Sequence, residues 1–239
     1  MKIAVCITTR NRTEVFGKGL AMQRAYLPKG ARIFVVDDNS TEPVAETQPV
    51  LEDETWYYAE KKLGIPRAKN KCLELAMEWG AHHIFLFDDD TWPLQRPWAN
   101  KYIKNKEPHL FYVFVNKGNQ TRTFGLEGMD KDNDLRWFNH TRGCMLYFES
   151  DVIETVGGFD PIFGDGGYEH TELSDRIHAA GFTTHAYQDA IDTDKYIYSS
   201  DEFDAVESTF TANERRKFII KNKPIKIKLR GRTDFIDYK

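Results

Sequence analysis

One stretch decides the fold class of this chain: Ile84-Phe85-Leu86-Phe87 runs directly into Asp88-Asp89-Asp90. An apolar run that ends in polar residues and a turn (Thr91-Trp92-Pro93) is typical of a buried strand. Three adjacent carboxylates repel one another and are costly to desolvate. A hard cation such as Mg²⁺ or Mn²⁺, which prefers oxygen ligands, would relieve this repulsion. A solvated acidic turn is the alternative reading.

The pattern occurs a second time. Ile33-Phe34-Val35-Val36 runs into Asp37-Asp38-Asn39-Ser40. Two apolar strands that end in paired aspartates predict a sheet whose carboxyl edge binds a cation and a polar ligand. In parallel sheets, ligands bind beyond the carboxyl ends of the strands.

Strand and helix patterns alternate along the first 90 residues. We expect strands at Lys2–Ile7, Arg32–Val36, Trp56–Ala59 and His83–Phe87, and helices at Arg12–Tyr26 and Pro66–Gly80. This alternation predicts an α/β fold: a Rossmann-like, mostly parallel central sheet with right-handed crossovers, flanked by helices.

The second half is more irregular. We expect strands at Leu110–Val115, Cys144–Phe148 and Phe182–Tyr187, and helices at Ser150–Val156 (capped by Ser150), Glu169–Ala180 and Glu207–Asn222. Between them, Asn116–Thr141 is polar and contains glycines, which predicts a substrate loop or lid. No linker or repeat is visible, so residues 1–239 are predicted to form a single domain.

Composition restricts the possible partners. The formal net charge of −4 gives no overall electrostatic case for nucleic acid. The longest apolar run, Leu110–Val115, is far too short to span a membrane. Cys6, Cys72 and Cys144 are distant from one another in apolar contexts, which predicts free thiols and a cytoplasmic protein. The locally basic stretch 221–232 is either a solvated surface or a docking patch for an anionic acceptor or membrane surface.

Four patches in order carry a family resemblance: Ile7-Thr8-Thr9-Arg10-Asn11-Arg12, Val36-Asp37-Asp38-Asn39-Ser40-Thr41, Phe87-Asp88-Asp89-Asp90, and Gly157-Gly158-Phe159-Asp160 leading to Gly167-Tyr168-Glu169-His170-Thr171-Glu172-Leu173. The sequence resembles a family 2 glycosyltransferase with the GT-A fold over roughly residues 2 to 190. Leu63-Gly64-Ile65-Pro66-Arg67-Ala68-Lys69-Asn70 adds a fifth match, similar to the family's Gly-x-x-x-Ala-Arg-Asn helix start.

The resemblance implies a nucleotide-sugar donor, with a UDP-sugar favoured, and a hexosyl or N-acetylhexosaminyl group to transfer. Asp38 would accept a hydrogen bond from the uracil ring. The implied donor contacts are Thr8, Arg10, Asp37, Asp38, Arg67, Asp88 and Asp89. Asp90, with Asp88, would hold Mn²⁺ or Mg²⁺ on the diphosphate. The family's frequent histidine ligand has no match, and Asp192, Asp194, Asp201 or water could replace it.

The catalytic base is expected at the start of the helix at Glu169. His170 occupies the family's base position, and an imidazole transfers protons readily near neutral pH. Glu169 would orient His170 or act as the base itself, while Glu172 supports the helix start. This arrangement predicts inversion of configuration, although His170 stands where the family has an acidic residue. Trp137 and Asp165 are the candidate acceptor contacts.

The resemblance divides the chain into a nucleotide-sugar-binding half (1–115), an acceptor and catalytic half (116–200), and a C-terminal helix with a basic tail (201–239). The acceptor class stays open among a glycan, a protein, a lipid-linked intermediate and a modified nucleic acid. A nucleotidyltransferase is an alternative function, but Ile7–Asn11 lacks the glycines of a phosphate-binding loop. A non-catalytic nucleotide-sugar-binding or carbohydrate-binding protein is another alternative, and it would be expected to lose the aspartates.

Overall fold

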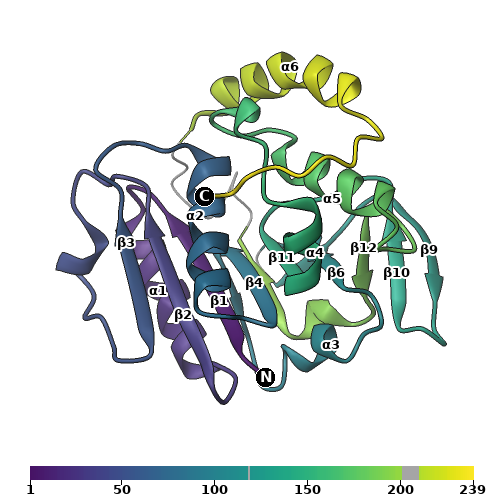
Figure 1. The fold of residues 1–239 in the computed structure, drawn as a ribbon. Helices are drawn as coiled ribbons and strands as arrows, with labels where there is room; N and C mark the ends of the chain where they lie inside the picture. Colours follow the sequence, from purple (N-terminus) through teal and green to yellow (C-terminus); the bar gives the residue numbers. More distant parts are fainter. Residues whose placement is uncertain (118, 201–209) are drawn as a thin grey trace.

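The computed structural model of the chain describes residues 1–117, 119–200 and 210–239. Its centre is a six-stranded sheet in the order β3-β2-β1-β4-β11-β6 (Figure 1). The strands are β1 (Ile3–Thr9), β2 (Ala31–Asp37), β3 (Glu54–Tyr58), β4 (His83–Asp88), β6 (His109–Tyr112) and β11 (Met145–Glu149). The first four are mutually parallel, and β11 runs antiparallel to both of its neighbours. The predicted α/β fold with a mostly parallel sheet is therefore confirmed.

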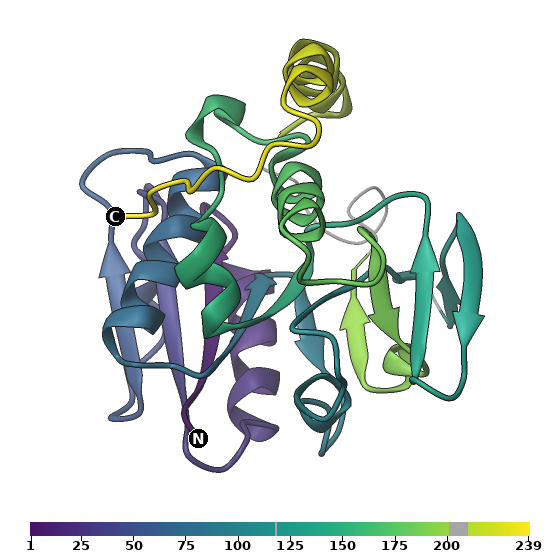
Figure 2. The ribbon, with the colours of Figure 1, turned by 45° about the vertical axis from the view of Figure 1, so that its right-hand side comes forward.

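Helices cover both faces of this sheet. Helix α1 (Thr13–Ala25) leads from β1 to β2, and α2 (Ile65–Glu78) leads from β3 back past β1 to β4. Right-handed crossovers that move in opposite directions across a sheet place their helices on opposite faces. Figures 1 and 2 show α1 and α2 in this arrangement, with α4 (Ser150–Val156) on the same face as α2.

The sheet core is apolar and continuous. Cys6, Cys72 and Cys144 are buried in it as free thiols, as expected. Helix α2 buries its apolar side against β1, β2 and β4. This packing fixes the carboxyl ends of three parallel strands at one edge, where the polar residues follow.

Short strands make up most of the second half. A three-stranded sheet is formed by β12 (Gln188–Ala190), β10 (Leu135–Phe138) and β9 (Leu126–Asp130). Two strand pairs accompany it: β7 (Val115–Lys117) with β8 (Gln120–Arg122), and β5 (Thr91–Pro93) with β13 (Ile197–Ser199). The remaining elements are α3 (Asn100–Ile103), α5 (Glu169–Ala179), α6 (Ala212–Lys228) and the 3₁₀ turns η1 (Val44–Glu46), η2 (Pro161–Phe163) and η3 (Thr193–Lys195).

Several expectations for this half were wrong in detail. Asn116–Thr141 contains β8, β9 and β10 instead of an irregular loop, and Phe182–Tyr187 contains no strand. Ser150 is the first residue of α4 and does not cap it, because its hydroxyl lies beside the Asp151 carboxylate.

The C-terminal helix begins later than expected. Thr211 caps α6 through a reciprocal pair of hydrogen bonds with Glu214, and the helix continues through Pro224 to Lys228. Residues 207–209 of the expected helix lie outside the described residues. The chain then returns across α4, where Ile236 bridges to Gly157. Within the three described ranges, no helix has the length and apolar character needed to cross a bilayer.

Candidate active site

The carboxyl ends of β1, β2 and β4 bring the polar patches together. Thr8 pairs with Asp88 across β1 and β4, and Thr9 pairs with Asp37 across β1 and β2. Asp38 follows directly, with its amide donating to the carbonyl of Thr9 at 2.9 Å. The predicted convergence of the two aspartate clusters on one sheet edge therefore follows from strand register.

Arg12 compensates two of the three aspartates at the end of β4. Its guanidinium lies 2.6 Å from Asp89 Oδ1 and 2.7 Å from Asp90 Oδ2. The Thr9 hydroxyl donates to Asp89 Oδ2 at 2.7 Å. Burial raises the pKa of Asp89 to about 7, against the attraction of Arg12. Asp89 is thus a buried anchor of the turn, and α1 approaches it closely enough that a Cβ on Gly19 would lie 2.6 Å from its carbonyl oxygen.

The carboxylates of Asp37 and Asp38 accept hydrogen bonds from different segments of the chain. The Asp37 carboxylate accepts the amides of Ser40 at 2.9 Å and Val44 at 3.1 Å, so it holds the turn after β2. The Asp38 carboxylate accepts the amides of Leu63 and Gly64 and lines the cavity described below. Burial raises the pKa of Asp38, although these two amides oppose the shift.

Lys69 on α2 is a cavity residue that was not among the residues expected from the sequence. Its ammonium is buried, donates to the carbonyl of Gly143 at 3.0 Å and lies 3.2 Å from Asp88 Oδ1. Burial lowers its pKa, but the carboxylates of Asp88 and Glu169 outweigh burial and raise it, so Lys69 stays charged. In the motif Gly-x-x-x-Ala-Arg-Asn, the basic residue directly precedes asparagine, which is the position of Lys69 before Asn70. The motif spacing was therefore the signal for Lys69, which lines the cavity, whereas Arg67, the basic residue expected there, is exposed outside it.

Glu169 and His170 form a pair at the start of α5. His170 Nδ1 lies 3.0 Å from Glu169 Oε1. Burial opposes ionisation of Glu169, yet His170 and Lys69 lower its pKa to about 2. A carboxylate can only accept a hydrogen bond, so Nδ1 donates to Glu169; in the neutral form of the ring, the Nε2 lone pair is then the free acceptor. Glu169 Oε2 is buried and accepts no hydrogen bond within the part of the chain that the structure describes.

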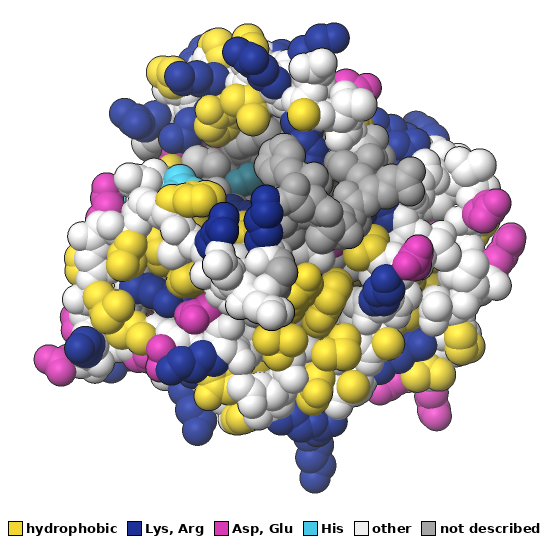
Figure 3. Space-filling model, turned by 180° about the vertical axis from the view of Figure 1, so that it is seen from behind, with side chains coloured by type: hydrophobic (Ala, Val, Ile, Leu, Met, Phe, Trp, Pro, Cys, Tyr) yellow, Lys and Arg dark blue, Asp and Glu magenta, His cyan; other side chains and the backbone are white. Residues whose placement is uncertain are grey.

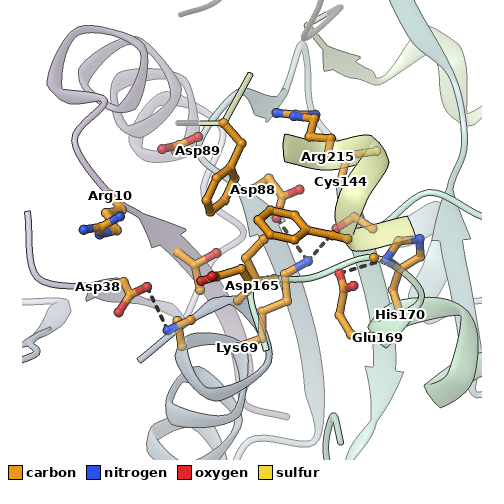
Figure 4. Close-up of a pocket in the computed structure, with 18 of the residues that line it drawn as sticks. Arg10, Asp38, Lys69, Asp88, Asp89, Cys144, Asp165, Glu169, His170 and Arg215 are labelled. Carbon is orange, nitrogen blue, oxygen red and sulfur yellow. Dashed lines mark hydrogen bonds and ion pairs between the residues drawn. The ribbon is translucent and has the colours of Figure 1, made fainter. Parts of the chain in front are cut away.

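These groups line one cavity of about 440 Å³. Its walls come from the sheet edge, the start of α2, the segment 141–144, the start of α5 and the first half of α6. Figure 4 shows Asp38 at one side of the cavity, Glu169 and His170 at the other, and the Lys69 ammonium between Asp88 and Glu169. The volume falls within the usual range for a small-molecule site.

Most of the expected site residues lie in this cavity: Thr8, Arg10, Asp38, Asp88, Asp89, Asp90, Asp165, Glu169 and His170. Additional cationic residues that the sequence reading missed also line it: Arg12, Lys62, Lys69, Arg142 and Arg215. Lys62 pairs with Asp165 at the rim.

Four expected residues lie elsewhere. Asp37 holds its turn, and Arg67 is exposed on α2 outside the cavity. Glu172 is buried in an ion pair with Arg176 on the next turn of α5. Trp137 stacks on His185, with ring centroids 4.1 Å apart, in the three-stranded sheet.

Two carboxylates that line the cavity, Asp88 and Asp90, could hold a metal ion; in the structure Asp88 lies beside Lys69 and Asp90 is paired with Arg12. Among residues 1–117, 119–200 and 210–239, no three acidic, histidine or cysteine side chains converge to form a complete metal site. Asp192 and Asp194 lie outside the cavity, where they pair with Lys195 and Arg136, so neither supplies a third ligand there. Asp201 lies outside the described residues. The donor set fits an ion such as Mg²⁺, which is commonly bound by one or two carboxylates together with substrate phosphates and water.

Solved structures with the same fold were found by comparison. A mannosyltransferase from Pyrobaculum calidifontis in complex with GDP-Man and Mn²⁺ matches 75% of this chain, with a TM-score of 0.54 and 20% identity. GalNAc-T7 with UDP, GalNAc and Mn²⁺ matches 92%, with a TM-score of 0.67 and 14% identity. The chain has the GT-A fold. TarS residues 1–349 from S. aureus, in complex with UDP-GlcNAc, matches 95%, with a TM-score of 0.61 and 14% identity.

This GT-A chain spans only part of each of those proteins: 52% of the mannosyltransferase, 48% of GalNAc-T7 and 66% of the TarS fragment. No protein-family model matches its sequence, and no curated protein matches it either. At these identities, the structural similarity shows the fold alone and does not show the activity.

Proposed function

We propose that the chain is a metal-dependent glycosyltransferase that transfers a hexosyl or N-acetylhexosaminyl group from a UDP-sugar to an acceptor hydroxyl, with inversion. One observation carries the proposal. Three carboxylates, Asp38, Asp88 and Asp90, line one cavity with the hydrogen-bonded side chains of Glu169 and His170, the candidate catalytic base and its partner. Solved proteins of the same fold hold nucleotide sugars or nucleotides with Mn²⁺, which supports this assignment.

The donor would extend along the carboxyl edge of the sheet. Asp38 keeps a carboxylate at the cavity wall, where it can accept the imide N–H of a uracil ring in addition to its two amide donors. Thr8 and Arg10 line the same wall. Asp88 and Asp90 would hold a divalent ion, which neutralises the charge of the diphosphate leaving group when it is bound.

The fixed cations of the cavity support the same leaving group. Lys69 remains charged beside Asp88, and Arg142 and Arg215 line the cavity near it. Positive groups that are held in place before the reaction stabilise negative charge that develops in the transition state. Glu169 Oε2, a buried acceptor with no partner among the described residues, is suited to a hydroxyl group of the substrate.

His170 is the proposed base. Glu169 accepts a hydrogen bond from Nδ1–H, so Nε2 can take the proton of the acceptor hydroxyl as the hydroxyl oxygen bonds to the anomeric carbon. The bond between that carbon and the diphosphate oxygen breaks at the same time. Displacement from the side opposite the leaving group inverts the configuration.

Calorimetry of UDP binding tests the donor and the metal together. We expect UDP with Mn²⁺ to bind at least about tenfold more tightly than UDP with EDTA, and more tightly than GDP or ADP. Asp88→Asn and Asp90→Asn should abolish the effect of Mn²⁺, while Asp132→Asn, an exposed carboxylate outside the cavity, should not. Equal affinity with and without Mn²⁺, or a preference for another base, would contradict the proposal.

Turnover is tested separately. A panel of UDP-hexoses and UDP-N-acetylhexosamines, assayed for slow donor hydrolysis with Mn²⁺, identifies the sugar. If UDP binds but no panel member is hydrolysed or transferred to any acceptor, the site is a nucleotide-sugar-binding site without transferase activity.

A further inference from the structure

The inward face of α6 is fixed by specific contacts. Asn222 is buried, and its amide donates to the carbonyls of Phe163 at 2.9 Å and Gly166 at 2.8 Å. Lys226 pairs with Asp175 at 3.0 Å. These contacts decide which side of the helix faces away from the molecule.

The outward face combines isoleucines with cations. Helix α6 contains seven basic residues and one acidic residue, although the whole chain has a net charge of −4. Arg216, Ile220, Lys223 and Ile227 follow one another at helical spacing and form one exposed stripe, with Ile219 beside it. Ile219, Ile220 and Ile227 are 47%, 63% and 61% exposed. Lys217, Lys221 and Lys228 form the adjoining exposed stripe.

Figure 3 shows this surface at the top of the molecule, where hydrophobic and basic side chains gather side by side and acidic ones are few. We call the set Arg216, Lys217, Ile220, Lys221, Lys223, Ile227 and Lys228 the α6 surface.

Two physical properties of the α6 surface point to the same partner. Exposed cations are attracted to an anionic lipid leaflet, and each Lys or Arg close to it adds to the attraction. Isoleucines exposed to water gain free energy when they enter the boundary between lipid headgroups and acyl chains. A nucleic acid backbone would use the cations and leave the isoleucines in water. We propose that the α6 surface docks on an anionic phospholipid bilayer, with the helix axis in the plane of the interface.

Helix α6 lies beside the candidate active site, so docking of its outward face would bring the bilayer close to the cavity. Arg215, Phe218 and Ile219, in the first half of the helix, line the cavity of the candidate active site. A bilayer bound to the outward face would therefore lie next to the cavity mouth. The docking itself depends only on the α6 surface and stands whether or not the chain transfers a sugar.

Vesicle flotation tests the proposal with the full chain. We expect the protein to float with vesicles of phosphatidylcholine and phosphatidylglycerol, much less with phosphatidylcholine alone, and less as NaCl increases from 50 to 500 mM. Ile220→Ser with Ile227→Ser should lower the partition coefficient at least about tenfold. Lys217→Glu with Lys221→Glu should lower it by a similar factor.

The control replaces one exposed lysine and one exposed aliphatic residue at the amino edge of the central sheet, away from α6. Lys29 precedes β2 and Leu51 precedes β3, and both are exposed at the amino edge of the sheet. Lys29→Glu with Leu51→Ser should leave flotation unchanged. UDP calorimetry on each variant checks that the cavity is intact, so loss of membrane binding is separable from failure of the proposed function.

Three results would overturn the proposal. One is the absence of flotation with anionic vesicles. The second is flotation that the isoleucine variant retains in full. The third is tight binding to single- or double-stranded oligonucleotides without any binding to vesicles, which would assign the α6 surface to nucleic acid.

Discussion

The ammonium of Lys69 lies 3.2 Å from Asp88 Oδ1, in a position from which water is nearly excluded on the lysine side. Lys69 belongs to α2 and Asp88 ends β4, while Glu169, which also attracts Lys69, begins α5. A cation of the chain itself thus links the two sides of the cavity. The same charges that hold the cavity in shape are therefore the ones that the proposed function assigns to the substrate.

We predict that Lys69→Met lowers the free energy of unfolding by about 3 kcal/mol at pH 7, because two carboxylates lose their buried partner. Asp88 is partly exposed, which keeps the loss at the lower end of the range for buried pairs. Urea denaturation measures it. Lys71→Met on the same helix removes a partly exposed pair with Glu74 and a cation–π contact with Tyr57, and should cost less, about 1 kcal/mol. Equal losses for the two variants would mean that the buried ion pairs of Lys69 contribute no more to stability than the pair of Lys71.

Arg12→Met should destabilise the fold by about 3–5 kcal/mol at pH 8, because Asp89 and Asp90 are left without their partner. The pKa of Asp89 is already raised to about 7, so below pH 7 this residue takes up a proton and the loss becomes smaller. Urea denaturation at pH 8 and pH 5 should therefore show a larger effect of the substitution at pH 8. Lys18→Met, on the exposed side of α1, is the control and should show no such pH dependence.

His170→Ala should lower turnover at least about 100-fold while UDP binding is retained, which is the usual scale for the loss of a general base. NMR of the product sugar should show an inverted anomeric centre with the wild-type enzyme. Nearly normal turnover of His170→Ala, together with an inactive Glu169→Gln, would move the base to Glu169. A retained anomeric configuration would contradict direct displacement.

Gly143→Ala should reduce turnover by about 10- to 100-fold, because a Cβ at this position would lie 2.8 Å from His170 Nδ1 and displace the imidazole from Glu169. A similar substitution in α1, Gly17→Ala, meets only the end of the Gln48 side chain and should leave turnover unchanged. Steady-state kinetics of both variants at saturating donor is the measurement. Full activity of Gly143→Ala would show that the position of His170 does not matter.

The lowered pKa of Glu169 predicts how the stability of the protein changes at acidic pH. Its folded-state pKa is lowered to about 2, so its ionisation stabilises the fold above the unfolded-state pKa of 4.5 and this contribution is lost as the pH falls toward 2. The difference in unfolding free energy between wild type and Glu169→Gln should therefore shrink by about 2 kcal/mol from pH 6 to pH 3. Urea titrations at four pH values test this. A difference that stays constant with pH would mean that folding does not lower the pKa of Glu169.

Much of the first half was readable from the sequence because its signals are local. Apolar runs that end in aspartate predict buried strands, and the strict alternation with helices predicts a parallel sheet. Parallel strands end at the same edge, so Asp38 and Asp88 had to meet. In the second half, β8 and β9 are short and mostly exposed, so residues 116–141 lack the apolar alternation that marks a strand.

Tertiary structure alone decided which of two neighbouring residues faces the cavity. Arg67 and Lys69 are two positions apart on α2, about 200° around the helix, so the packing of α2 on the sheet buries one and exposes the other. Asp37 and Asp38 point in different directions after β2, and only the turn that Asp37 holds leaves Asp38 at the cavity wall. The sequence by itself determined the sheet, its edge and the residue types gathered there. Packing between elements distant in the chain determined which side chains share the cavity, because side-chain direction depends on contacts that no local pattern encodes.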